Sequence, residues 1–227
     1  IEPKLVVQGD LFVTGPASFL YDSLTVDTLG FVYVNGTGAG VQVSTRGVDN
    51  SGGIILSGTG GSFGPGSTGS QSITNRASGS ITTLPGATRF HLNGQLINEG
   101  TITLASETVL RRTNAAGTTH ATASHVNSGL IELVPGGDLA IELGGSSPTF
   151  TNSGTITLDD AASVLSVSNL ASPAGTIINS ATGILNGVGT VDVRTGVPNG
   201  VNHGTIAPGL SPGTLTWMGS IPMGPTG

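Results

Sequence analysis

The chain contains no cysteine and has few charged or aromatic side chains. Without cysteine it has neither a disulfide framework nor a cysteine metal site. Charged residues make up only 9% of its 227 residues, and the formal net charge is −6. Nucleic acids and anionic membrane surfaces recruit clusters of lysine and arginine, so this balance argues against both as partners. No stretch approaches the roughly 20 apolar residues of a transmembrane helix, so we expect no membrane insertion.

Glycine and aliphatic residues are abundant instead. The 38 glycines do not follow the Gly-X-Y period of collagen, and a hydrophobic content of 36% is too high for a disordered chain. Short segments alternate a small or polar residue with an aliphatic one, a period typical of β-strands rather than helices. The clearest such segments are residues 101–104, 130–133, 140–143, 155–158 and 190–193. The composition therefore predicts an all-β protein.

An asparagine followed closely by a glycine and then an aliphatic residue recurs seven times. Successive asparagines are 25, 23, 29, 25, 27 and 23 residues apart. Such a sustained period indicates one supersecondary unit of about 25 residues that repeats along the chain. The asparagines are Asn50, Asn75, Asn98, Asn127, Asn152, Asn179 and Asn202.

One coil per repeat accounts for this pattern. Two or three short strands joined by tight corners would form a coil, and equivalent strands of successive coils would pair in parallel. We expect the corner glycines to supply positive φ and the corner asparagines to bond to one another through their amides. The aliphatic residues that follow should stack inside the coil. This predicted core stack is Ile102, Ile131, Ile156, Ile184 and Ile206.

The predicted fold is thus a single-domain parallel β-helix, or β-solenoid, with about 25 residues per coil. An antiparallel sandwich is the alternative, but a sandwich does not require a sustained repeat with the same corner. We expect residues 1–45 to form an N-terminal cap and the first rungs, and residues 46–217 to form the shaft. Excursions from the shaft are expected at residues 57–72 and 105–124, and residues 218–227 should form a tail.

Three of the repeat units carry a family resemblance. Residues 98–104, residues 152–158 and above all residues 204–216, with the sequence GTIAPGLSPGTLT, resemble the repeats of bacterial autotransporter passengers and related surface proteins. The resemblance implies a right-handed parallel β-helix that is secreted or displayed on the bacterial cell surface. Passengers have many activities, including adhesion, proteolysis and self-association, so the resemblance does not select one.

The candidate reactive residues do not form a recognisable active site. Asp159 and Asp160 are the only adjacent acidic pair, and adjacent residues on a strand point to opposite faces. A glycosidase needs two carboxyl groups at a controlled separation, so this pair suits catalysis only from a turn. We expect no catalytic residue, no cofactor and no metal site.

The basic residues are expected to be solvated. His120 and His125 are too far apart for a strand pair and have no third ligand nearby in the sequence, whereas zinc needs three or four converging groups. The pair Arg111 and Arg112 is also assigned to the solvated surface. The Gly- and Ser-rich residues 57–70 have the composition of a flexible excursion.

The leading functional expectation is a non-enzymatic extracellular structural protein. A β-solenoid rod with few charges would associate with copies of itself, head to tail or laterally, into a fibre, stalk or surface layer. The alternative is an adhesin that binds glycans or host surfaces through residues 57–70 or residues 111–125. A polysaccharide-degrading enzyme on the same scaffold comes third.

Overall fold

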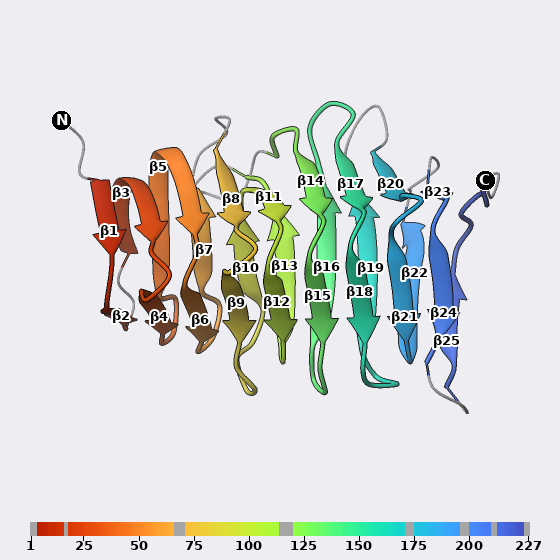
Figure 1. Cartoon of the computed structure of the whole chain (residues 1–227), viewed down its shortest axis with the longest axis horizontal. Helices are drawn as coiled ribbons and strands as arrows, with labels where there is room; N and C mark the ends of the chain where they lie inside the picture. Colours follow the sequence, from red (N-terminus) through yellow and green to blue (C-terminus); the bar gives the residue numbers. More distant parts are fainter. Residues whose placement is uncertain are drawn as a thin grey trace.

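The chain forms a rod of parallel strands. The computed structural model describes residues 4–15, 18–65, 71–113, 120–170, 175–195, 200–209 and 213–224. Within these ranges the chain forms 25 strands and no helix. Strands from successive coils pair in parallel, which confirms the predicted β-solenoid. Figure 1 shows the coils following one another along the long axis, with the two ends of the chain at opposite ends of the rod.

One strand from each coil contributes to a nine-stranded sheet. Its strands, in spatial order, are β2 (Asp10–Thr14), β4 (Phe31–Asn35), β6 (Gly53–Ser57), β9 (Ser80–Thr83), β12 (Thr101–Leu104), β15 (Leu130–Leu133), β18 (Thr155–Leu158), β21 (Ile184–Gly187) and β24 (Thr205–Pro208).

The other strands belong to a 16-stranded sheet that divides into two stacks. We call the first the asparagine stack, because each of its strands ends at one of the repeat asparagines. The second half of β5 (Gly40–Asn50), which ends at Asn50, is the first member of this stack. The asparagine stack also contains β8 (Ser72–Asn75), β11 (Gln95–Asn98), β14 (Ser124–Asn127), β17 (Thr149–Asn152), β20 (Thr176–Asn179) and β23 (Val201–Asn202). We call the second the return stack. It contains β7 (Ser62–Pro65), β10 (Phe90–Asn93), β13 (Glu107–Arg111), β16 (Asp138–Leu143), β19 (Val164–Asn169), β22 (Gly189–Thr195) and β25 (Leu215–Met218).

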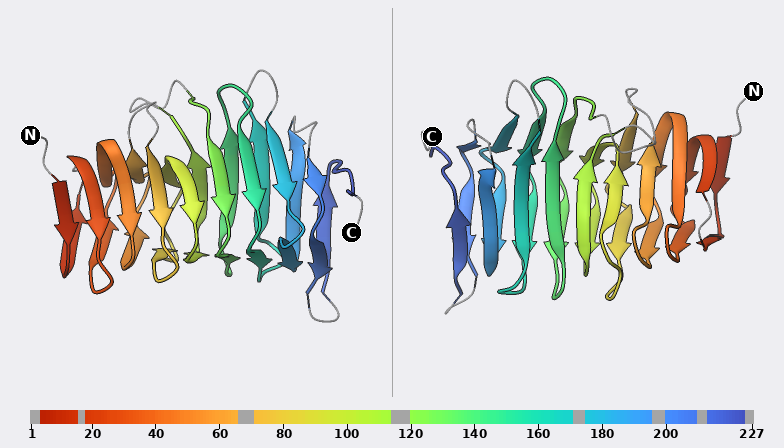
Figure 2. Two further views of the ribbon diagram at one scale, coloured as in Figure 1. Left: turned by 45° about the horizontal axis from the view of Figure 1, so that its top comes forward. Right: turned by 180° about the vertical axis from the view of Figure 1, so that it is seen from behind.

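The two stacks join near the N-terminal end through long strands. β5 (Gly40–Asn50) pairs with β7 through its first half and with β8 through its second half. β3 (Ser18–Val26) pairs along both halves of β5, and β1 (Lys4–Val7) pairs with the second half of β3. In each later coil the chain runs down the asparagine stack, through the nine-stranded sheet and back along the return stack (Figures 1 and 2).

Alternation along each strand builds the core. In β12 the side chains of Ile102 and Leu104 are buried, while the threonines beside them are partly exposed. Ile102 pairs in register with Ile131, which pairs with Ile156, so identical side chains stack up the rod. Every second residue is thereby removed from water and contributes hydrophobic free energy in proportion to its apolar area.

The prediction for Ile184 is wrong. Ile184 is 36% exposed and points outward, and Leu185, which is 3% exposed, takes the core position. The register pairs Ile156 with Leu185, and Leu185 with Ile206. The cause is a longer corner: four residues separate Asn179 from β21, whereas two separate Asn152 from β18. Ile206 faces the core but is only partly buried, because its strand is the last of the sheet.

The seven repeat asparagines form one buried ladder. Each amide from Asn50 to Asn179 donates from Nδ2 to Oδ1 of the next asparagine at 2.7 or 2.8 Å. The second N–H bond of each Nδ2 goes to the carbonyl oxygen of the residue that opens the next coil's strand in the nine-stranded sheet. None of the seven side chains is more than 2% exposed. The ladder therefore satisfies buried polar groups and fixes the bend between the two sheets.

The corner glycines serve a different purpose from the one expected. None of the glycines that follow the seven asparagines has a positive φ, and neither do the asparagines. These glycines lie against the preceding coil instead. A Cβ atom on Gly129 would stand 2.1 Å from the carbonyl oxygen of Gly100, and one on Gly154 would stand 2.1 Å from that of Gly129. Close stacking of backbones, rather than an unusual backbone conformation, requires glycine at these corners.

Both expected excursions are shorter than the sequence suggested. Within residues 57–72, β7 pairs with β5 and β10, and Phe63 is completely buried between Val41 and Leu92. Within residues 105–124, β13 is an ordinary strand of the return stack. The remaining residues 66–70 and 114–119 lie outside the described part of the chain.

The two terminal regions belong to the rod as well. Residues 1–45 supply β1 to β4 and the first residues of β5, so the described part of this region forms coils. In the expected tail, the backbone N–H of Asn202 donates to the carbonyl oxygen of Pro222 at 2.9 Å, and the backbone N–H of Gly224 donates to the carbonyl oxygen of Asn202 at 2.7 Å. Residues 221–224 thus lie along the free edge of β23.

Candidate functional site

The connections that vary most lie along one edge of the rod. We define the loop edge as the described residues of the connections from the return stack to the asparagine stack, which are residues 71, 94, 112–113, 120–123, 144–148, 170, 175 and 200. The lengths of these connections range from one residue to twelve, whereas the asparagine corners contain two or four. In a repeat protein, insertions that map to one side often mark the binding face. In Figure 1 the connection between β16 and β17 rises above the top of the rod on this edge.

A group of charged and titratable residues lies on the outer face of the return stack near this edge. We call Arg89, His91, Arg111, His120 and Glu142 the outer cluster. His91 pairs with Val109, two residues before Arg111 on the neighbouring strand, so His91 and Arg111 face the same side. Leu110 pairs with Ile141, so the residues that follow them, Arg111 and Glu142, lie beside each other on neighbouring strands.

Contacts within the outer cluster are incomplete. His120 Nε2 lies 3.6 Å from Glu142 Oε2, and Arg89 lies 3.7 Å from Glu107. His91 Nδ1 and Arg111 Nε are shielded from solvent and have no hydrogen-bond partner in the described structure. Val109 also faces outward yet is completely buried, so this part of the outer face is covered.

The surroundings of His91 disfavour its protonated form. Burial, with the charges of Arg111 and Arg89, lowers the pKa of His91 to about 4, against a weaker opposing effect of Glu142. Burial also lowers the pKa of Arg111, although Glu142 acts in the opposite direction. His91 is therefore neutral at pH 7, in a positive local field on a chain that is acidic as a whole.

A second pair, Arg112 and His125, lies at the loop edge on the core side of the coil. His125 is fully buried between Leu96 and Phe150, and its Nδ1 accepts the backbone N–H of Leu96 at 3.1 Å. Burial and then the charge of Arg112 lower the pKa of His125 to about 3. Since Nδ1 accepts a hydrogen bond, the neutral ring carries its proton on Nε2.

The expectation of solvated basic residues is therefore wrong for several of them. His125 is a core residue, and Arg111 and Arg112 are partly buried, with shielded Nε atoms. The signal for His125 was present in the sequence. The residue two positions before the repeat asparagine is apolar in neighbouring coils, as at Leu96 and Phe150.

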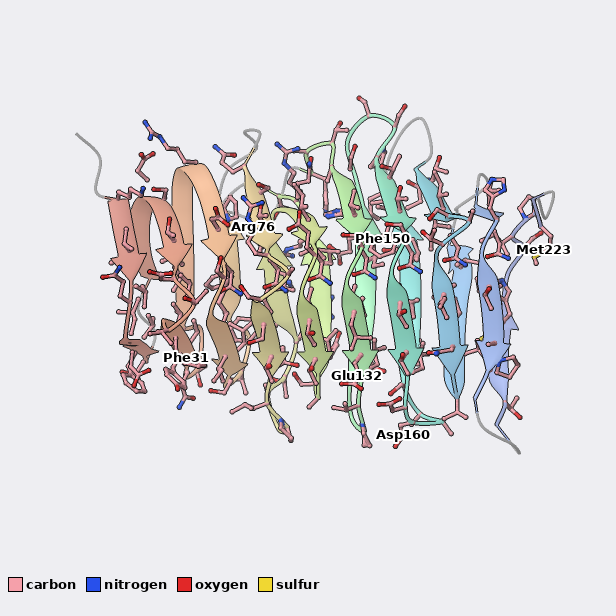
Figure 3. All side chains as sticks on the ribbon, viewed as in Figure 1. Phe31, Arg76, Glu132, Phe150, Asp160 and Met223 are labelled. Carbon is pink, nitrogen blue, oxygen red and sulfur yellow. The ribbon has the colours of Figure 1, made fainter. Side chains whose placement is uncertain are left out.

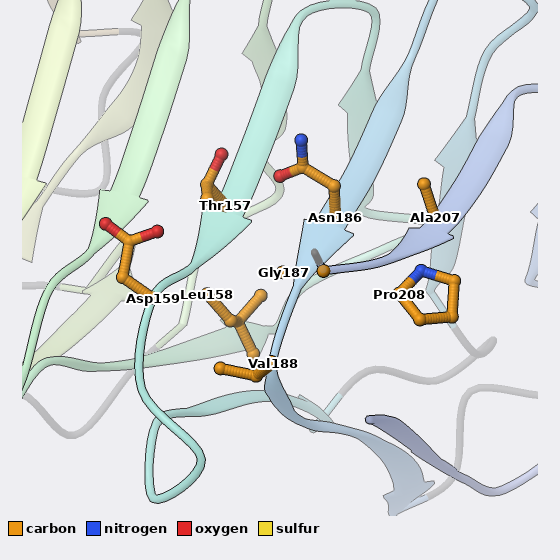
Figure 4. A pocket seen from close by; sticks show the side chains of 9 residues that line it. Thr157, Leu158, Asp159, Asn186, Gly187, Val188, Ala207 and Pro208 are labelled. Carbon is orange, nitrogen blue, oxygen red and sulfur yellow. The ribbon is translucent and has the colours of Figure 1, made fainter. Parts of the chain in front are cut away.

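Asp159 and Asp160 lie in the turn between β18 and β19. Asp160 Oδ1 accepts the backbone N–H of Ala162 at 2.8 Å, so this carboxylate stabilises its own turn. Asp159 lines a hollow of about 410 Å³ on the outer side of the nine-stranded sheet (Figure 4). Gly187, which pairs in register with Leu158, is one of the residues that line this hollow. Its lining is Thr157, Leu158, Asp159, Asn186, Gly187, Val188, Ala207, Pro208 and Gly209.

The outer face of the nine-stranded sheet carries few charges. Two files of outward side chains follow the register across all nine strands. Of their eighteen members only Asp10 and Glu132 are charged, which leaves a surface of short hydroxyl and apolar groups. The first file is Phe12, Tyr33, Ile55, Thr82, Thr103, Glu132, Thr157, Asn186 and Ala207. The second is Asp10, Phe31, Gly53, Ser80, Thr101, Leu130, Thr155, Ile184 and Thr205.

Apolar groups are exposed on this face. Phe12 is 62% exposed and stacks on Tyr33 with ring centroids 4.6 Å apart, and Phe31 is 39% exposed. Figure 3 shows Phe31 near the first coils and Glu132 further along the rod. Exposed apolar side chains gathered on one sheet face are typical of a contact surface.

The described parts of the chain hold neither a cluster of metal-ligating side chains nor a membrane-spanning helix. No three histidine, aspartate or glutamate side chains converge there as metal ligands. No helix long and apolar enough to cross a membrane occurs in the same residues.

Comparison with protein-family models, with curated proteins and with solved structures gave no match to this chain.

Proposed function

We propose that the protein is a non-enzymatic structural rod of the bacterial exterior that associates side by side with copies of itself. The observation that carries the proposal is the outer face of the nine-stranded sheet. It runs the length of the described rod and presents two charged residues among eighteen. Such a face loses little hydration free energy when it packs against another copy. The assignment to the cell exterior rests on the resemblance of the repeats to autotransporter passengers.

The C-terminal end of the rod favours lateral over head-to-tail association. An open strand edge can pair with another chain, but residues 221–224 occupy the edge of β23 through hydrogen bonds to Asn202. Ile221 also packs against the core there. The last coil is therefore partly covered, whereas no described segment covers the outer face of the nine-stranded sheet.

Sedimentation velocity over a concentration series tests lateral association, with Thr82→Lys as the disrupting variant. Thr82 lies mid-strand in the outward file, between Ile55 and Thr103. A lysine there would place a charge at the centre of the proposed contact and should shift the sedimenting species towards single rods. A variant that associates as strongly as the wild type would contradict the proposal.

Thr151→Lys is the matched control. Thr151 is also a partly exposed threonine in mid-strand, but it lies on the asparagine stack, between Val126 and Ile178. The Thr151→Lys variant introduces the same charge into the same kind of strand and should leave association unchanged. Equal losses in the two variants would show that net charge, rather than this face, governs association.

Adhesion is a second candidate, favoured by the gathering of variable connections at the loop edge. A rigid rod with insertions on one edge can present them to a partner, because changes in these connections leave the packed strands of the rod unaltered. Replacement of residues 112–123 by a short glycine-rich turn should abolish binding on a glycan array while the rod stays folded. Unchanged binding would remove this candidate.

A further inference from the structure

The outer cluster combines two features that structural packing alone does not require. Arg111 has no carboxylate within ion-pair distance among the described residues, although Glu142 is nearby on the next strand. Its Nε, together with Nδ1 of His91, is shielded from water and unpartnered. A buried N–H group without an acceptor destabilises the folded state. The fold therefore keeps two unpartnered polar atoms, Nε of Arg111 and Nδ1 of His91, at a position shielded from solvent.

We propose that the outer cluster binds a single oxyanion group, a carboxylate or a sulfate, between Arg111 and His91. The guanidinium group of arginine presents N–H groups in a planar fork that matches either oxyanion. Arg111 and His91 face the same side of adjacent strands, and the charge of Arg89 also acts on His91. Arg89 has an unusual φ of +45°, so the backbone is held in a rarely populated conformation next to this cluster.

The charges around the cluster suit one anionic group rather than a polyanion. Arg89 and Arg111 add two positive charges, while Glu142 contacts His120 and Glu107 faces Arg89. These carboxylates offset part of the positive charge around His91. The rest of the chain, with a net charge of −6, repels a densely charged polymer.

Anion binding should change the titration of His91. Burial, Arg111 and Arg89 hold its pKa at about 4 in the free protein, and Glu142 opposes them weakly. An anion beside the ring favours the imidazolium form, so the pKa of His91 should rise in the complex. A rise of about one unit corresponds to roughly tenfold tighter binding of the anion to the protonated form.

The test is an NMR titration of the histidine ring signals between pH 3 and 8 in sodium sulfate, with sodium chloride at equal ionic strength as reference. Signals of His91 are identified from the spectrum of His91→Gln. We expect the pKa of His91 to rise in sulfate relative to chloride. Parallel titrations with acetate, and with galacturonic acid against galactose, show whether a carboxylate is accepted. An identical His91 titration in all these solutions would overturn the proposal.

Two variants assign the effect to Arg111. Arg111→Gln should abolish the sulfate-dependent shift, and Arg76→Gln is the matched control, because Arg76 pairs with Asp49 on the asparagine stack. A shift that survives Arg111→Gln, or that disappears equally in Arg76→Gln, would contradict the proposed site. If Arg111→Gln does not fold, Arg89→Gln at an exposed position should weaken the shift, and an unchanged shift would count against the site. The inference does not depend on self-association of the rod.

Discussion

Replacing one asparagine in the middle of the ladder should cost far more stability than replacing the last one. Asn127 accepts from Asn98 and donates to Asn152 and to the carbonyl oxygen of Thr155. Asn127→Ala leaves three polar groups without these partners inside the rod. At about 1–3 kcal/mol for each unpaired group, the loss should be at least about 3 kcal/mol.

Asn202→Ala is the matched comparison. Within the ladder Asn202 accepts only from Asn179, and its own amide donates to Gly204 and contacts the Met223 sulfur. Asn179 keeps a further bond to the carbonyl oxygen of Thr205. The expected loss is about 1 kcal/mol, because a single buried N–H group is left without its main acceptor.

Urea denaturation followed by circular dichroism and by Trp217 fluorescence measures both variants. The rod is a repeat structure in which each coil contacts only its neighbours, so the two probes also report whether unfolding spreads from one end. A loss for Asn127→Ala no larger than that for Asn202→Ala would refute the reasoning. It would mean that stacked coils, rather than paired amides, hold this corner.

Three further predictions follow from the core and its titratable groups. Leu185→Ala should lower the free energy of unfolding by about 2–5 kcal/mol and Ile184→Ala by less than about 1 kcal/mol, in the same urea assay, since only Leu185 faces the core; equal losses would contradict the observed register. Gly129→Ala should prevent close stacking of two coils and lower the melting temperature more than Ala162→Gly in an exposed turn; a melting temperature equal to that of the wild type would contradict the close approach to Gly100. The pKa of His125 is lowered to about 3, so the unfolded chain, with a histidine pKa near 6.5, binds the proton more readily below that pH. The contribution of His125 is then full above about pH 6.5 and falls by up to about 1.4 kcal/mol per pH unit on acidification towards pH 3, and His91, with a pKa of about 4, adds a slope of the same sign; His125→Leu should reduce the total slope in denaturation at pH 7, 6 and 5, and an unchanged slope would remove His125 as a source of it.

The period of the repeat was enough to predict the fold, because the same corner recurs in every coil. It was not enough to predict the register of each strand. Ile184 and Leu185 are adjacent and both aliphatic, so alternation alone does not tell which of them faces the core. Only the pairing of Leu185 with Ile156 decides it.

Composition misled the prediction where a strand depends on its neighbours. The segment Ser62–Pro65 is short and lies among glycines and serines, yet β5 and β10 pair with it on either side. Phe63, an isolated aromatic residue in the sequence, fills the core there. Its burial is a consequence of the stack rather than of local propensity.

The outer cluster was hidden for a related reason. His91 and Arg111 belong to successive coils and become neighbours only through the pairing of β10 with β13. The sequence placed Arg111 and Arg112 together, but these two residues point to different sides of the coil. Grouping by sequence therefore joined the wrong pair and missed His91.

Electron microscopy of the unmodified protein over a wide concentration range tests lateral association most directly. The account predicts rods that lie side by side in growing number as the concentration rises, in contact along the face formed by the nine-stranded sheet. Single dispersed rods at every concentration, or rods joined only end to end, would contradict it.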